Sequence, residues 1–187
     1  MVKGYTVGAQ RRLTIWVDQE DAQLADTAVS TTIEVTNGVA IIAERAMWWV
    51  ATSTPGSWFE AHNSPGSTVT GTQWALAEGE VGGALSFSTF ILIANTSAFA
   101  GSATVKLMFE DGGSLTRTFS LSANSRFNVD VGTEFPGAAG RRFGAVITSV
   151  STGGGVPLIV VERAMYSYAL GVVWAAGTNA LATRLQP

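Results

Sequence analysis

The chain has 187 residues, 14 acidic against 11 basic residues and a formal net charge of -3, and it contains no cysteine. Because 47% of its residues are apolar and only 13% are charged, it can bury a core and is not expected to be disordered. The lack of cysteine excludes disulfides and thiolate metal sites. No run of Lys or Arg exceeds a pair and no apolar run approaches the roughly 20 residues of a membrane helix, so we expect neither a nucleic-acid partner nor membrane insertion.

The first part of the chain predicts one strand, a trace of helix and a linker. Leu13, Ile15 and Val17 occupy alternate positions, which is typical of a strand with one buried face. Residues 18–26 alone hint at a helix. Residues 51–71 are rich in Ser, Thr, Gly and Pro and make the best candidate for a linker.

The later part of the chain predicts antiparallel strands. Val105, Leu107 and Phe109 alternate with polar residues, and a glycine-containing turn at 111–113 leads to a second alternating strand over 114–121, so we expect a hairpin. Another strand follows around residues 127–131. More continuous apolar runs are typical of central strands buried on both faces, and they cover residues 90–94, 145–150 and 156–161.

An internal repeat is visible in the sequence. The tetrad Glu-Arg-Ala-Met occurs at residues 44–47 and again at 162–165. Upstream, residues 5–15 match 119–129 in the order of aromatic, hydroxyl, apolar and Arg positions, and downstream Trp58 with Asn63 matches Trp174 with Asn179. A period of roughly 115 residues suits one β-sandwich module.

The repeat predicts an unequal domain organisation. Residues 73–187 form a complete copy, here called copy two, and residues 1–72 form copy one, which corresponds only to the second half of a module. Copy one lacks counterparts of about residues 73–118. The fold we expect is therefore all-β, an antiparallel Ig-like β-sandwich repeat with one complete copy and one C-terminal half-copy.

Several short motifs carry a resemblance to a known family. They are residues 74–79, 90–95, 122–126 and 62–64, together with the two Glu-Arg-Ala-Met tetrads. As a set they resemble the tandem β-rich repeats of large secreted or surface-attached bacterial proteins, a family of uncharacterised function. The resemblance implies an extracellular or cell-surface location and a structural or adhesive role. The first seven residues themselves lack the apolar core of a signal peptide.

The charged residues of the tetrads predict ion pairs. Glu44 and Arg45 are adjacent in an apolar strand, as are Glu162 and Arg163, so the members of each pair point to opposite faces. We expect them to pair with opposite charges, Arg163 with Glu78 among them. A glycosidase would need two carboxyl groups such as Glu78 and Glu162 at a defined separation, and we favour the structural interpretation because a site in a half-copy would lack half of its walls.

His62 is the only histidine, so a catalytic triad would depend on it and a histidine metal cluster is impossible within one chain. Its equivalent in copy two is Thr178. We expect His62 to pack or to form a local hydrogen bond, and we predict no catalytic residue, no metal site and no cofactor.

Five tryptophans are predicted to lie near the junction between the copies: Trp48, Trp49, Trp58, Trp74 and Trp174. Flat aromatic faces suit either a packed junction or a carbohydrate-binding surface, and we favour the junction. The leading hypothesis is a non-enzymatic structural or interaction module of an extracellular bacterial repeat protein. The alternative hypothesis is a carbohydrate-binding module that uses these Trp residues to bind a glycan.

The missing half of copy one predicts a protein partner. Sheets with unfilled edges and a bare inner face favour the addition of another strand. The options are packing of copy one onto copy two, pairing with another chain as a homo-oligomer or fibre, and pairing with upstream repeats of a longer parent chain. We favour the last two options, because packing onto copy two would require copy two to offer an edge while its own sandwich stays closed.

Overall fold

The computed structural model describes residues 1–50, 60–169 and 171–187, which divide into the units Met1–Thr31 and Thr32–Pro187. The first unit is mostly irregular and holds one short helix, α1 (Val17–Glu20). The Glu20 carboxylate accepts hydrogen bonds from the Lys3 ammonium at 2.9 Å and from the Tyr5 hydroxyl at 2.8 Å. No helix in the described part of the chain is long and apolar enough to cross a membrane.

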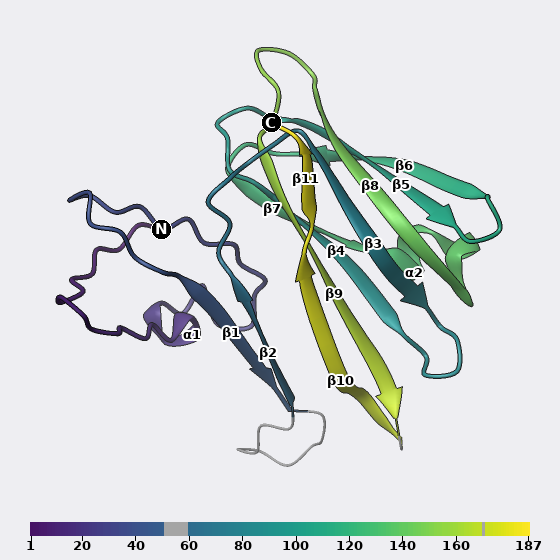
Figure 1. Cartoon of the computed structure of the whole chain (residues 1–187), viewed down its shortest axis with the longest axis horizontal. Helices are drawn as coiled ribbons and strands as arrows, with labels where there is room; N and C mark the ends of the chain where they lie inside the picture. The colour runs from purple at the N-terminus through teal and green to yellow at the C-terminus, as the bar shows by residue number, and fades with distance from the viewer. Residues whose placement is uncertain (51–59, 170) are drawn as a thin grey trace. The chain divides into compact units, whose positions relative to one another are not determined.

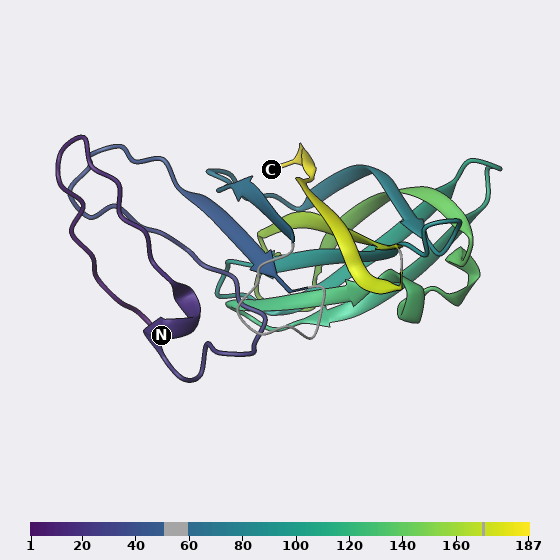
Figure 2. The same ribbon diagram turned by 90° about the horizontal axis from the view of Figure 1, so that it is seen from below.

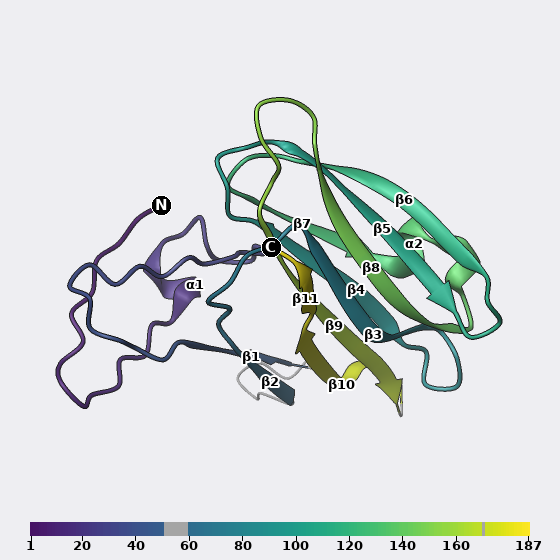
Figure 3. The same ribbon diagram turned by 45° about the horizontal axis from the view of Figure 1, so that its top comes forward.

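The second unit is built from three antiparallel sheets (Figure 1). The smallest pairs β1 (Glu44–Trp49) with β2 (Glu60–Pro65). The four-stranded sheet has the order β10 (Val172–Leu181), β9 (Ile159–Ala169), β4 (Ser88–Asn95) and β7 (Ser125–Asp130). The five-stranded sheet has the order β11 (Thr183–Gln186), β3 (Gln73–Val81), β8 (Arg141–Ser151), β5 (Gly101–Phe109) and β6 (Ser114–Leu121), and Figure 3 shows β3, β8, β5 and β6 side by side. The helix α2 (Val131–Glu134) and the 3-10 turn η1 (Pro136–Ala138) connect β7 to β8.

The two larger sheets form a sandwich with one hydrophobic core between them. Alternate residues of the strands point into it, and the fully buried ones include Ile91, Ile93, Val105, Leu107 and Ile147. This alternation is the period-two pattern that the sequence shows. The predicted all-β, antiparallel sandwich is therefore confirmed.

The predicted hairpin and central strands are also in place. β5 and β6 form the hairpin, whose turn contains Gly112 with φ at +84°. β4, β8 and β9 each have a strand on both sides. β9 begins at Ile159, later than the predicted run, because Pro157 has no backbone N–H to donate to a ladder.

One predicted strand is wrong. Residues 13–16 form no strand, Val17 begins α1, and the side chains of Leu13 and Ile15 are exposed. The equivalent strand of copy two, β7, pairs with β4. No described strand lies beside residues 13–16, and a strand without a neighbour leaves its backbone donors and acceptors without partners.

The hairpins β1–β2 and β9–β10 have the same register. Ala46 pairs with Asn63, and Ala164 pairs with Asn179. The Gly66 N–H donates to the Ala43 carbonyl at 3.0 Å, just as the Ala182 N–H donates to the Val161 carbonyl at 2.9 Å. The two Glu-Arg-Ala-Met tetrads thus occupy equivalent places in equivalent hairpins, while the Ig-like repeat itself stays a prediction.

We predict unequal effects of two Ile→Ala substitutions. Ile147→Ala opens a cavity in the core and should lower the free energy of unfolding by about 2 to 5 kcal/mol. Ile42→Ala, at a fully exposed side chain, should change it by less than ~0.5 kcal/mol. Chemical denaturation measures both, and equal losses would show that the core lies elsewhere.

Candidate functional site

The candidate site is the contact between the hairpin β1–β2 and the outer face of the four-stranded sheet. Arg45, Met47 and Trp49 occupy alternate positions of β1 and therefore share one face. That face lies against the outward residues of β9, which include Glu162 and Tyr166. Figure 2 shows the blue hairpin beside the yellow strand β10.

A carboxylate lies at the centre of the polar part of this contact. The Arg45 guanidinium donates to Glu162 Oε1 at 2.7 Å, and the Asn179 amide donates to the same oxygen at 2.6 Å. The Glu162 side chain is only 18% exposed, against 40% for Arg45. Burial lowers the pKa of the nearby Arg126, Arg45 lowers it further, and Glu162 opposes both effects. Glu162 thus pairs with one guanidinium group, that of Arg45, and partly offsets the charge of a second, that of Arg126.

Aromatic rings form the apolar part of the contact. The aromatic cluster consists of Trp49, His62, Phe90, Tyr166 and Trp174. Tyr166 stacks on Trp174 with ring centroids 4.8 Å apart, and Trp49 meets Tyr166 edge-on at 5.3 Å. The Trp49 indole N–H also donates to the Trp174 carbonyl at 2.9 Å, so the ring is fixed at both its apolar face and its polar atom.

Gly177 gives Trp49 the room it needs. A Cβ atom at this position would lie 2.8 Å from the Trp49 ring and 2.7 Å from the Tyr166 ring, closer than real Cβ contacts allow. Any other residue at 177 would therefore force the Trp49 and Tyr166 rings to shift. Gly177 is not among the predicted site residues, although the sequence shows Tyr166 directly after the second tetrad and Gly177 after two alanines.

His62 lies inside the contact. Its Nε2 atom is 3.4 Å from the Tyr166 hydroxyl, and its ring centroid is 5.3 Å from that of Trp49. Its Nδ1 atom is buried without a hydrogen-bond partner. Burial lowers the pKa of His62, and the neighbouring Arg45 lowers it further against the opposing charge of Glu162. The ring therefore packs as neutral imidazole.

The predicted tryptophans do not form one group. Trp74 is 1% exposed in the core, so its indole cannot face a ligand. Trp48 is half exposed and lies on the opposite face of β1 from Trp49, because neighbouring residues of a strand alternate. Trp49 and Trp174 meet in the aromatic cluster, and Trp58 lies outside the described residues.

The remaining predicted ion-pair residues lie apart from the cluster. Arg163, 5% exposed on the inner face, approaches the Glu78 carboxylate to 3.5 Å, and Glu78 itself is 72% exposed. Glu44 is exposed at the start of β1, opposite Pro65. Glu78 and Glu162 therefore belong to different ion pairs and do not face each other as a catalytic pair.

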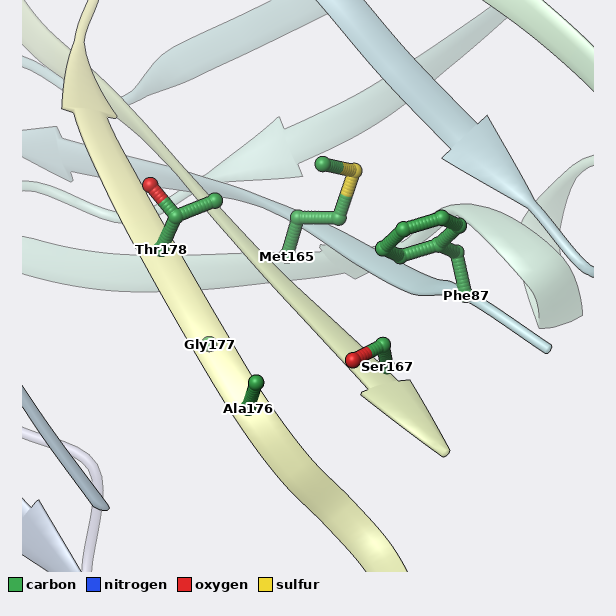
Figure 4. A pocket seen from close by; sticks show the side chains of 6 residues that line it. All are labelled: Phe87, Met165, Ser167, Ala176, Gly177 and Thr178. Atoms are coloured by element: carbon green, nitrogen blue, oxygen red, sulfur yellow. The ribbon is translucent and has the colours of Figure 1, made fainter. Parts of the chain in front are cut away.

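Two hollows are found in the described part of the second unit, and the first of them shares Gly177 with the contact above. One, of about 180 Å³, is lined by Phe87, Met165, Ser167, Ala176, Gly177 and Thr178, and Figure 4 shows the Phe87 and Met165 side chains next to each other. It is smaller than the roughly 300 to 1,000 Å³ of typical small-molecule sites. The other contains two ion pairs, Arg141 with Asp111 at 2.5 Å and Arg142 with Glu80 at 3.1 Å, so both of its guanidinium groups already have carboxylate partners. Among the described residues, no three His, Asp or Glu side chains form a group that could hold a metal.

Comparison with known proteins supports the fold alone. No family model and no curated protein matches the sequence. The chain is similar in structure to the crystal structure of Thermotoga maritima 1070, with a TM-score of 0.52 and 12% sequence identity, over 62% of this chain and 96% of that chain. The fold and the site together define an antiparallel β-sandwich protein with an additional hairpin packed on its outer face.

We predict an energetic coupling between Arg45 and Glu162. In a double-mutant cycle with Arg45→Ala and Glu162→Gln, the coupling should be about 1 kcal/mol at low salt and smaller at high salt, because the pair is partly exposed. The measurement is the opening free energy of β1 amides by hydrogen exchange. The control is the pair Arg142 and Glu80, in which Arg142 is 70% exposed. Its coupling, measured in the same way on the amides of β3, should be less than ~0.5 kcal/mol. A coupling of zero for Arg45 and Glu162 would show that the contact is not electrostatic.

We also predict that the contact weakens in acid. The depressed pKa of His62 means that the undocked hairpin binds a proton at a higher pH than the docked hairpin. The opening free energy of β1 should therefore be constant above about pH 6.5, the ordinary pKa of histidine, and decline as the pH falls below it. Tyr166 stays neutral throughout, because burial raises the pKa of its hydroxyl.

Hydrogen exchange at several pH values measures this decline. His62→Thr places the residue of the equivalent position 178 at the contact and should remove the pH dependence between about pH 6.5 and 5, where Glu and Asp remain charged. A decline that persists unchanged in His62→Thr would assign it to another group.

Proposed function

We propose that the chain is a non-enzymatic structural or interaction module of an extracellular bacterial repeat protein. The observation that carries the proposal is the Arg45–Glu162 contact with its aromatic cluster. It joins a hairpin from copy one to the sheet of copy two, and side chains of both copies are committed to it. Packing between neighbouring copies is the way in which repeat proteins acquire stability.

The equal registers of β1–β2 and β9–β10 support the repeat interpretation. The two hairpins match pair by pair along the tetrads. They also match in the backbone hydrogen bonds that the N–H groups of Gly66 and Ala182 donate. The Ig-like class and the extracellular location remain part of the proposal, and they rest on the sequence pattern and the family resemblance.

Two titratable side chains weighed as candidates for catalysis, His62 and Glu162, are used in packing and in an ion pair. His62, which any triad would require, faces Tyr166 and Trp49. Glu162 is held by Arg45 and Asn179. These arrangements support an interaction role, because each group is used to hold two parts of the protein together.

The exposed apolar side chains support self-association. Ile33, Val39 and Ile42 are 58%, 61% and 100% exposed within residues 32–43. Several large aliphatic side chains exposed in one segment are typical of a surface that binds another protein. We infer that copies of the chain associate through this segment at high concentration.

We predict that size exclusion with light scattering will show species above 19.5 kDa that grow with concentration. The double variant Ile33→Thr with Ile42→Thr should reduce this association, because it removes apolar area from the segment. Val173→Thr, at a side chain 65% exposed elsewhere on the second unit, is the matched control. A stable monomer that binds no apolar dye would overturn the self-association.

The alternative, a carbohydrate-binding module, makes a different prediction. Such a module would use Trp48, the half-exposed tryptophan of β1, to contact the sugar. Binding on a glycan array that is lost in Trp48→Ala and retained in Trp16→Ala, a similarly exposed Trp in the first unit, would favour this alternative. We expect no reproducible glycan binding.

A further inference from the structure

One edge of the hairpin β1–β2 has no strand beside it. In the described part of the chain, β1 pairs with β2 only. Directly before β1, residues 41–43 are the apolar sequence Ile-Ile-Ala, but they form no strand. The side chains of Ile41 and Ile42 are 47% and 100% exposed. An exposed apolar edge of this kind is a template for another strand.

The equivalent edge in copy two shows what fits it. Residues 159–161 precede Glu162 as residues 41–43 precede Glu44, and there Ile159 and Val161 are fully buried. They pair with β4, with Ile159 opposite Asn95 and Val161 opposite Ile93. The difference between the two segments is therefore the presence of β4, because the hairpins that follow them are alike.

We propose that the β1 edge, defined as residues 41–45, binds a β4-like strand from the first half of another repeat of the same type. The strand would run antiparallel to β1 in the register of β4 with β9, so that a residue equivalent to Ile93 lies opposite Ala43 and one equivalent to Ile91 lies opposite Arg45. This inference rests on the proposed function and names its partner. The partner is a polypeptide that resembles residues 73–118 of this chain.

The present contact competes with this partner. By register, the face of β1 that carries Arg45 and Trp49 is equivalent to the inward face of β9 that carries Arg163. Here that face is docked on Glu162 and Tyr166 instead of covering a core. An incoming half-repeat would place its own core residues on the same face, so the hairpin must leave copy two when the partner binds.

The competition assigns different effects to the two members of the ion pair. Glu162 contacts Arg45 only when the hairpin is docked, whereas its hydrogen bond with Asn179 lies within copy two in either state. Arg45 stabilises the docked hairpin and, when the partner is bound, could meet the partner's equivalent of Glu78, as Arg163 meets Glu78 in copy two. Glu162→Gln should therefore strengthen partner binding by about fivefold, whereas Arg45→Ala should not.

The experiment is a fusion protein in which a second copy of residues 73–118 is placed ahead of Met1 of the full chain. Because the chain has no cysteine, a single Ile41→Cys substitution reports the accessibility of the edge through its rate of maleimide labelling. We expect labelling to slow by at least about tenfold in the fusion protein, since the equivalent Ile159 is fully buried. Val173→Cys, far exposed in either state, controls for general changes in reactivity.

A matched fusion protein carries Ile91→Asp and Ile93→Asp in the added segment only, which removes the core-facing side chains of the β4-like strand. It should label at the rate of the unfused chain, and adding Glu162→Gln to the original fusion should slow labelling further. Equal labelling rates in the two fusion proteins would overturn the inference. If the unfused chain is a monomer but the original fusion protects position 41, self-association fails while the β1 edge stands.

Discussion

Backbone pairing with β4 separates β7 and the start of β9, which are strands, from residues 13–15 and 41–43, which carry a similar apolar pattern and form no strand. β4 lies inside the four-stranded sheet, pairs with β9 on one side and β7 on the other, and places Ile91 and Ile93 in the core. Segments of similar apolar pattern become strands where β4 is their neighbour and stay irregular where it is absent. The hydrogen-bonding requirement of the backbone thus outweighs the local strand propensity of the sequence.

The hairpin β1–β2 is the exception that follows from the same constraint. Its two strands pair with each other along their shared edge, so the hairpin forms without β4. An isolated two-stranded hairpin is only marginally stable in water, and it gains stability when a face packs on another element. Docking on the outer face of β9 supplies that packing, and the Arg45–Glu162 pair removes the penalty that Glu162 would otherwise meet under a covering hairpin.

The fold of the sandwich could be predicted because its signals are local. Alternation in β5 and the apolar run of β4 identify strands directly, and the glycine turn identifies β6 as the hairpin partner of β5. The strand around Leu13 was mispredicted because Leu13, Ile15 and Val17 alternate as clearly as the residues of a real strand do. Such a pattern does not show whether a neighbouring strand is present to pair with it. For the site, the charges of the tetrads indicated ion pairs, but the sequence could not show that Arg45 meets Glu162, since that contact depends on where a hairpin docks.

The sequence also could not show which tryptophans meet in the site, but it does specify which hairpin face can accept another hairpin. In the outer face of β9–β10, Tyr166 lies opposite Gly177, and the absence of a Cβ there admits the Trp49 ring. In the equivalent outer face of β1–β2, Trp48 lies opposite Ala61. By register Ala61 carries a Cβ at the position where Gly177 leaves space, and a larger ring occupies the position of Tyr166. The outer face of β1–β2 therefore does not reproduce the surface that accepts a hairpin, so docking of this kind would stop after one hairpin instead of continuing as a stack.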